Sequence, residues 1–92
     1  MPTRRILIHG RVQGVFFRAT ARDVAEELGV NGWIRNTEEG DVEAVVSGGT
    51  QQLERFIAWC RQGPPRAVVS KVEIEERDDQ QFSGFEVKRS YI

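Results

Sequence analysis

The chain has 92 residues, which is enough for one domain with a single hydrophobic core and too few for two. Its formal net charge of −1 excludes a general positive field that would attract nucleic acid or anionic lipid. The one cysteine, Cys60, excludes an internal disulfide and a cysteine-rich zinc site. The first apolar run is too short for a signal-peptide core or a spanning helix, so we expect a cytoplasmic protein.

Hydrophobic spacing and turn residues predict alternating strands and helices. Gly29 is placed to end the first helix in a left-handed conformation, and Thr50 is a plausible N-cap for the second. The fourth strand is expected to place Val68, Val72 and Ile74 on one face. In chain order, the expected elements are a strand over 6–9, a helix over 19–28, hairpin strands over 32–36 and 41–47, a helix over 51–62, and strands over 68–77 and 85–90.

This order predicts a ferredoxin-like βαββαβ sandwich, an α+β fold in which two helices cover one face of an antiparallel sheet, with residues 1–92 as a single domain. The strands of the first βαβ unit run parallel and are joined by a right-handed crossover. Parallel strands end at the same edge of a sheet. The loop over 11–18 and the turn over 36–40 should therefore be neighbours, at strand carboxyl ends, where open α/β sheets bind ligands.

The loop between the first strand and the first helix has features of an anion site. Residues 10–18 read GRVQGVFFR, and the helix N-terminus that follows offers free N–H groups and a positive dipole end. Arg18 can present its planar guanidinium to two phosphate oxygens. The glycine spacing fits neither the Walker pattern nor the dinucleotide-binding pattern. On these residues alone, a structural turn with a solvated Arg18 is as good an interpretation as a phosphate site.

The side chains expected at this edge suit one kind of phosphate hydrolysis. They are Arg18, Asn36 and the carboxylates of the exposed turn, without a serine–histidine pair or a metal cluster. A phosphomonoester has an alkoxide leaving group, which needs an acid or a metal. An acyl phosphate instead releases a carboxylate, with a reference pKa of about 4, which needs no protonation. Asn36 can orient an attacking water, although asparagine in a turn also fits a plain hairpin cap.

Both segments resemble the signatures of the acylphosphatase family. Residues 10–18 match Gly-Arg/Lys-Val-Gln-Gly-Val-x-aromatic-Arg, and residues 32–42 match Gly-x-aliphatic-x-Asn-x-x-acidic/Asn-Gly-x-aliphatic. With the shared element order, the resemblance covers essentially the whole chain. It implies a hydrolase that cleaves the carboxyl–phosphate bond of an acyl phosphate, giving a carboxylate and inorganic phosphate, without a metal or a cofactor.

The resemblance also implies residue roles. Arg18 would bind the phosphate and Asn36 would position the attacking water, which makes these two the predicted catalytic residues. The predicted phosphate loop supplies the amides of Gln13, Gly14, Val15, Phe16, Phe17 and Arg18. The expected partner is a small-molecule acyl phosphate, and we expect a monomer that binds neither nucleic acid nor a membrane.

Three alternatives compete with this interpretation. The segment 60–66 fits the Cys-x-x-Gly-x-x-Arg spacing of cysteine-dependent phosphatases, but Cys60 falls at a helix end, where carbonyls repel anions, and two prolines remove amide donors. Small RNA-binding domains share the element order, but the strands over 6–9 and 41–47 carry no aromatic side chain for base stacking. Acylphosphatase-like domains also begin larger hydrogenase-maturation proteins. Because this chain ends where the domain ends, we expect the stand-alone enzyme.

Overall fold

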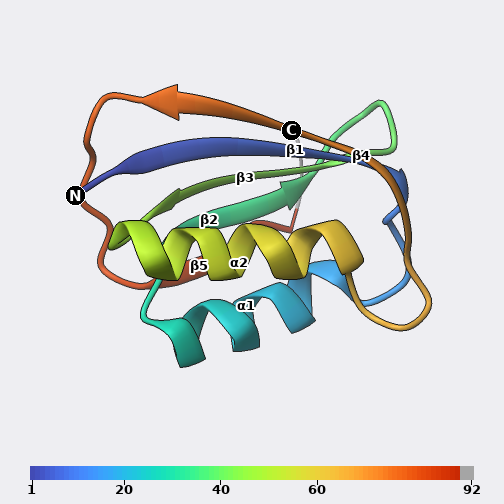
Figure 1. Cartoon of the computed structure of the whole chain (residues 1–92). Helices are drawn as coiled ribbons and strands as arrows, with labels where there is room; N and C mark the ends of the chain where they lie inside the picture. The colour runs from blue at the N-terminus through green and yellow to red at the C-terminus, as the bar shows by residue number, and fades with distance from the viewer. Residues whose placement is uncertain (90–92) are drawn as a thin grey trace.

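The computed structural model describes residues 1–89 and shows a five-stranded sheet with two helices against one face (Figure 1). In chain order the elements are β1 (Thr3–Arg11), α1 (Phe17–Leu28), β2 (Asn31–Asn36), β3 (Val42–Ser47), α2 (Thr50–Gln62), β4 (Val68–Arg77) and β5 (Phe85–Val87). The predicted βαββαβ order is confirmed. The expected last strand stops at Val87, and the end of its predicted span, residue 90, lies outside the described residues. No helix in the described part of the chain has the length and apolar character needed to cross a membrane.

The strand order across the sheet is β4-β1-β3-β2-β5. β3 lies antiparallel between β1 and β2, so β1 and β2 run in the same direction. The predicted antiparallel arrangement holds for the four longer strands, while β5 pairs parallel with β2 and makes the sheet mixed. As a result, β1, β2 and β5 all end at the edge of the sheet where α1 begins.

The hydrophobic core lies between the helices and the sheet. The buried side chains of the helices are Phe17, Ala21 and Ala25 on α1, and Leu53, Phe56, Ile57 and Cys60 on α2. Gly29 ends α1 as predicted, with φ 75°, and the N–H of Val30 donates to the carbonyl of Ala25. The N-cap of α2 is Gly49 and not Thr50, because the chain is already helical at residue 50. Burying each large apolar side chain contributes about 1.5–3 kcal/mol.

Gly10 allows β1 and β4 to approach closely where their register shifts. Its φ is 127°, and a Cβ at this position would lie 2.1 Å from the carbonyl oxygen of Val68. Beyond the shift, Val69 and Val72 pack against the core, while Val68 is 61% exposed. The predicted alternation of β4 from Val68 is therefore wrong at its start, because a bulge changes which side chains face inward. The first glycine of the loop motif serves strand packing.

Charged side chains cover the face of the sheet opposite the helices. Glu43 of β3 accepts hydrogen bonds from Nε of Arg5 at 2.5 Å and from Nε of Arg35 at 2.6 Å. Burial alone would raise the pKa of Glu43, but these two arginines hold it below its ordinary value. The open face is therefore stabilised by a carboxylate shared between two strands.

His9 bridges two carboxylates on this open face. Its Nδ1 lies 3.1 Å from Oδ2 of Asp41, and its Nε2 lies 2.5 Å from Oε2 of Glu73. Contact with an acceptor through both nitrogens favours the doubly protonated ring. The hydrogen bond to Glu73 is the main cause that raises the pKa of His9, and Asp41 adds to it. The same hydrogen bond lowers the pKa of Glu73.

We expect the folded protein to lose stability as the pH rises through the elevated pKa of His9. The stabilising contribution of the bridging imidazolium is fully present below the ordinary histidine pKa of about 6.5, and it is lost as the pH rises through the raised pKa of the folded state. Urea unfolding from about pH 6 to about pH 9 should show the decline. His9→Gln should flatten it, and an equal decline in that variant would contradict the assignment.

Candidate functional site

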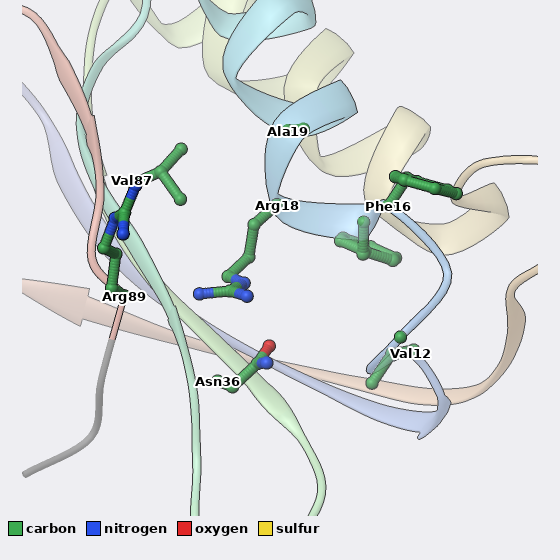
Figure 2. Close-up of a pocket in the computed structure, with 9 residues that line it drawn as sticks. Val12, Phe16, Arg18, Ala19, Asn36, Val87 and Arg89 are labelled. Atoms are coloured by element: carbon green, nitrogen blue, oxygen red, sulfur yellow. The ribbon is translucent and has the colours of Figure 1, made fainter.

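The edge at which β1, β2 and β5 end contains a pocket of about 530 Å³. Figure 2 shows how side chains from the loop after β1, the start of α1, the end of β2 and the end of β5 converge on it. The lining residues are Val12, Gly14, Phe16, Phe17, Arg18, Ala19, Asn36, Val87 and Arg89. The structure therefore brings the predicted loop and the predicted turn residue into one site.

The loop before α1 leaves backbone donors unused. The N-cap of α1 is Phe16, no side chain caps the helix, and its first turn has no acidic residue. In the described range 1–89, the amides of residues 13–16 donate no backbone hydrogen bond. Free N–H groups at the positive end of a helix dipole form a ready site for an anion.

Arg18 extends from the first turn of α1 into the pocket (Figure 2). Its Nη1 donates a hydrogen bond of 2.8 Å to the carbonyl oxygen of Lys88, just after β5. That bond fixes one side of a guanidinium that has five N–H donors, which leaves further donors for a ligand. A cation in the first turn is unfavourable for the helix dipole, so its placement is better explained by anion binding than by helix stability. Arg89 adds a second cation to the lining.

Asn36 is the last residue of β2, and its side chain points toward the guanidinium of Arg18 (Figure 2). Its Oδ1 is buried and has no hydrogen-bond partner among the described residues. A buried acceptor without a partner typically costs about 1–3 kcal/mol, and this cost is removed when a ligand or water in the pocket donates to it. The arrangement fits an amide that holds a reactant, and it gives no support to a structural cap.

Thr37, and not Asn36, makes the hydrogen bonds that close the hairpin turn. Its N–H donates to the carbonyl of Asp41 at 2.9 Å, and its Oγ1 accepts from the N–H of Asp41 at 3.1 Å. The N–H of Gly40 donates to the carbonyl of Thr37 at 3.2 Å. The turn is therefore closed without the side chain of Asn36.

Two residues of the predicted phosphate loop direct their side chains away from the pocket. Val15 is buried in the core. Gln13 donates from Nε2 to the carbonyls of Thr37 at 2.9 Å and of Asp41 at 2.8 Å. Only the backbone amides of these two residues can take part in anion binding. The side chain of Gln13 instead links the loop to the hairpin turn, and so fixes the separation of the two predicted catalytic residues.

A family model described as Acylphosphatase matches residues 4–87. The chain belongs to the acylphosphatase family. It is 49% identical to the acylphosphatase of Thiobacillus denitrificans, over 98% of this chain and 99% of that protein. It is 48% identical to that of Pelotomaculum thermopropionicum, over 89% and 90% of the two chains. Among solved structures it is similar to an acylphosphatase from Coxiella burnetii, with 40% identity, a TM-score of 0.91, and coverage of 95% of this chain and 92% of that one.

Cys60 is not part of the candidate site of this acylphosphatase. It is fully buried on α2 in the core and does not line the pocket. Burial raises the pKa of its thiol, which disfavours the thiolate that a cysteine nucleophile requires. In residues 1–89 no group of three or more histidine, cysteine or acidic side chains is placed to hold a metal ion.

The chain after β5 also contributes to the pocket, which was not predicted from the sequence. Val87 and Arg89 line the pocket, and the carbonyl of Lys88 receives the hydrogen bond from Arg18. The sequence carries no direct signal for this, because the sheet was expected to be antiparallel and the parallel pairing of β5 with β2 is a finding of the structure. With that pairing known, the strand-end argument that located Asn36 also places the end of β5 at this edge.

Gln13→Glu should lower the free energy of unfolding by about 1–3 kcal/mol, since it replaces a shared donor with a carboxylate that faces two carbonyl oxygens. Urea unfolding at neutral pH measures the change. Gln81→Glu, in an exposed loop, is the matched control and should stay within about 0.5 kcal/mol of the wild type. Equal losses in the two variants would show that the link between loop and turn contributes nothing.

Proposed function

We propose that Arg18 and the amides of residues 13–18 bind the phosphoryl group of an acyl phosphate, and that Asn36 orients the water that attacks it. Hydrolysis of acyl phosphates to a carboxylate and inorganic phosphate is the activity of the family to which the chain belongs. The residue roles are supported above all by one observation, the buried Oδ1 of Asn36 without a partner, directed at a pocket that also holds Arg18.

The phosphoryl group is held by charge and by hydrogen bonds. Its oxygens accept from the free loop amides and from the guanidinium of Arg18, whose other side is fixed on the carbonyl of Lys88. These donors are already oriented before the ligand arrives, so they stabilise the charge that develops on the equatorial oxygens without reorganising. Binding and electrostatic stabilisation thus come from the same groups.

The water attacks phosphorus in line with the departing carboxylate. Asn36 Oδ1 accepts one hydrogen bond from the water, which directs an oxygen lone pair at the phosphorus. The bond from water oxygen to phosphorus forms as the bond from phosphorus to the carboxyl oxygen breaks. Among the described residues that line the pocket, none carries a carboxylate or an imidazole, so a phosphoryl oxygen of the substrate takes the proton.

We propose as well that residues 1–92 act as one domain and as a monomer in the cytoplasm, without a metal or a cofactor. The leaving group supports the last point, because a carboxylate with a reference pKa of about 4 departs without an acid or a Lewis acid. The buried free thiol of Cys60 fits a reducing compartment. Assays of acyl phosphate hydrolysis should therefore contain a chelator throughout, to test that no metal is needed.

Arg18→Ala should raise the inhibition constant of inorganic phosphate about 10–100-fold, because the bound phosphate loses a charged hydrogen-bond donor. Arg18→Lys should not restore it, because a point ammonium cannot replace the bidentate guanidinium. Hydrolysis of acetyl phosphate with increasing phosphate measures the constant, and Arg22→Ala, exposed on α1, is the control. A folded Arg18→Ala that binds phosphate as tightly as the wild type would remove Arg18 from the site.

Asn36→Ala should lower kcat by a factor on the order of 10²–10³ while changing phosphate inhibition little, because the water is positioned mainly in the transition state. Its melting temperature should not fall, since the variant removes a buried acceptor that has no partner. Thr37→Val is the matched variant for the turn and should destabilise by about 1 kcal/mol. An unchanged kcat with a lowered melting temperature in Asn36→Ala would identify Asn36 as a hairpin cap.

A further inference from the structure

Phe16 is an exposed aromatic residue at the mouth of the pocket. Its side chain is 72% exposed although it is among the most hydrophobic in the chain. Its φ of 65° makes it the one non-glycine residue with a positive φ in the described part of the chain. Bulky residues rarely adopt this conformation, and outliers of this kind concentrate where a ligand is held.

The fold does not require an aromatic ring at this position. What α1 needs from Phe16 is its backbone, because the carbonyl accepts hydrogen bonds from the N–H of Thr20 at 3.1 Å and from its Oγ1 at 2.8 Å. Glycine or asparagine adopts the same left-handed conformation with less strain. The ring adds strain and exposed apolar surface, so its use must lie outside the folding of the loop.

In-line displacement determines where the acyl group must go. The water is held at Asn36, so the leaving carboxylate lies on the opposite side of phosphorus. Figure 2 shows the start of α1, with Ala19, on the side of Arg18 away from Asn36. Phe16 and Val12 line the pocket to one side of Arg18. An acyl group that leaves away from Asn36 and turns toward this side would meet an aromatic ring and small apolar side chains.

We propose that Phe16 contacts the acyl group of the substrate and makes the enzyme selective for acyl phosphates with an aromatic or other apolar acyl group. The inference rests on the proposed orientation of phosphate and water by Arg18 and Asn36. An aromatic acyl group stacks on the exposed ring and buries apolar surface of both partners. An acetyl group is too small to cover the ring.

Phe16→Asn removes the ring and retains a residue that tolerates the left-handed conformation. We expect the wild type to hydrolyse benzoyl phosphate with a kcat/KM about tenfold above that for acetyl phosphate. In Phe16→Asn this ratio should fall about tenfold, because the KM for benzoyl phosphate rises. Val68→Asn, which removes an exposed apolar side chain of β4 outside the pocket, is the matched control and should keep the wild-type ratio.

A binding measurement separates this inference from the proposed hydrolysis. Calorimetric titration with benzoylphosphonate and acetylphosphonate, which cannot be hydrolysed, should show the same preference in the wild type and its loss in Phe16→Asn. If the preference for binding is present but neither acyl phosphate is cleaved, the proposed catalytic roles are wrong and the acyl contact stands.

Three outcomes would overturn the inference itself. The first is an equal benzoyl-to-acetyl ratio in the wild type and Phe16→Asn. The second is a uniform loss of affinity in Phe16→Asn for both phosphonates and for inorganic phosphate, which would mean that the ring only supports the loop. The third is a wild-type preference for an acyl phosphate with a second negative charge, which Arg89 would bind in the place of the ring.

Discussion

The pairing of β3 with both β1 and β2 is the constraint on which the site depends. Val42 of β3 is opposite Ile8 on one side and Asn36 on the other, so Asn36 lies two strand spacings, about 10 Å, from Ile8 of β1. Asn36 also shares its face of the sheet with the buried Ile34, two residues before it, and this is the face that the helices cover. A slip of one residue would turn Asn36 to the open face and separate it from Arg18.

This dependence explains why much of the site could be predicted from the sequence. The periodicity of the apolar residues predicts the order of strands and helices, and that order alone makes β1 and β2 end together. Whether Asn36 closes the turn or faces a ligand could not be predicted from its residue type and position, because both roles use the same residue type in the same place, and only the family resemblance favoured the second role. The choice rests on Thr37, whose backbone and hydroxyl close the turn and leave Oδ1 of Asn36 without a partner. Such hydrogen bonds depend on the geometry of the turn, which has no hydrophobic signature.

The ends of the strands show the same limit. β1 begins at Thr3, ahead of the predicted apolar run, because a buried hydrogen bond of 2.8 Å joins the hydroxyls of Thr3 and Ser47. Oγ1 of Thr3 also accepts from the N–H of Gln80 at 2.9 Å. Where polar residues inside a sheet form hydrogen bonds to one another, the hydrophobic pattern predicts a loop and not a strand. For the same reason the bulge at Gly10 was missed, since it depends on how closely a neighbouring strand approaches.

The departures from local structural rules gather around the pocket. The N-terminus of α1 has no side-chain cap and carries Arg18 in its first turn, Phe16 has a positive φ, and Asn36 has a buried oxygen without a partner. The C-terminus of the same helix follows the ordinary pattern. Arg4 Nε is the other buried side-chain polar atom without a hydrogen bond among the described residues. It lies 2.9 Å from a carboxylate oxygen of Glu76 and is compensated by charge.

In the proposed complex, a single acyl phosphate would compensate most of these departures. Its phosphoryl oxygens would accept from the free amides and cap α1, and its charge would offset that of Arg18 beside the helix dipole. The attacking water would donate to Asn36, and the acyl group would cover the ring of Phe16. Natural sequences usually pair polar groups and cover apolar side chains within the chain, but here these groups are left for the ligand. This is the pattern expected where stability has been exchanged for binding and catalysis.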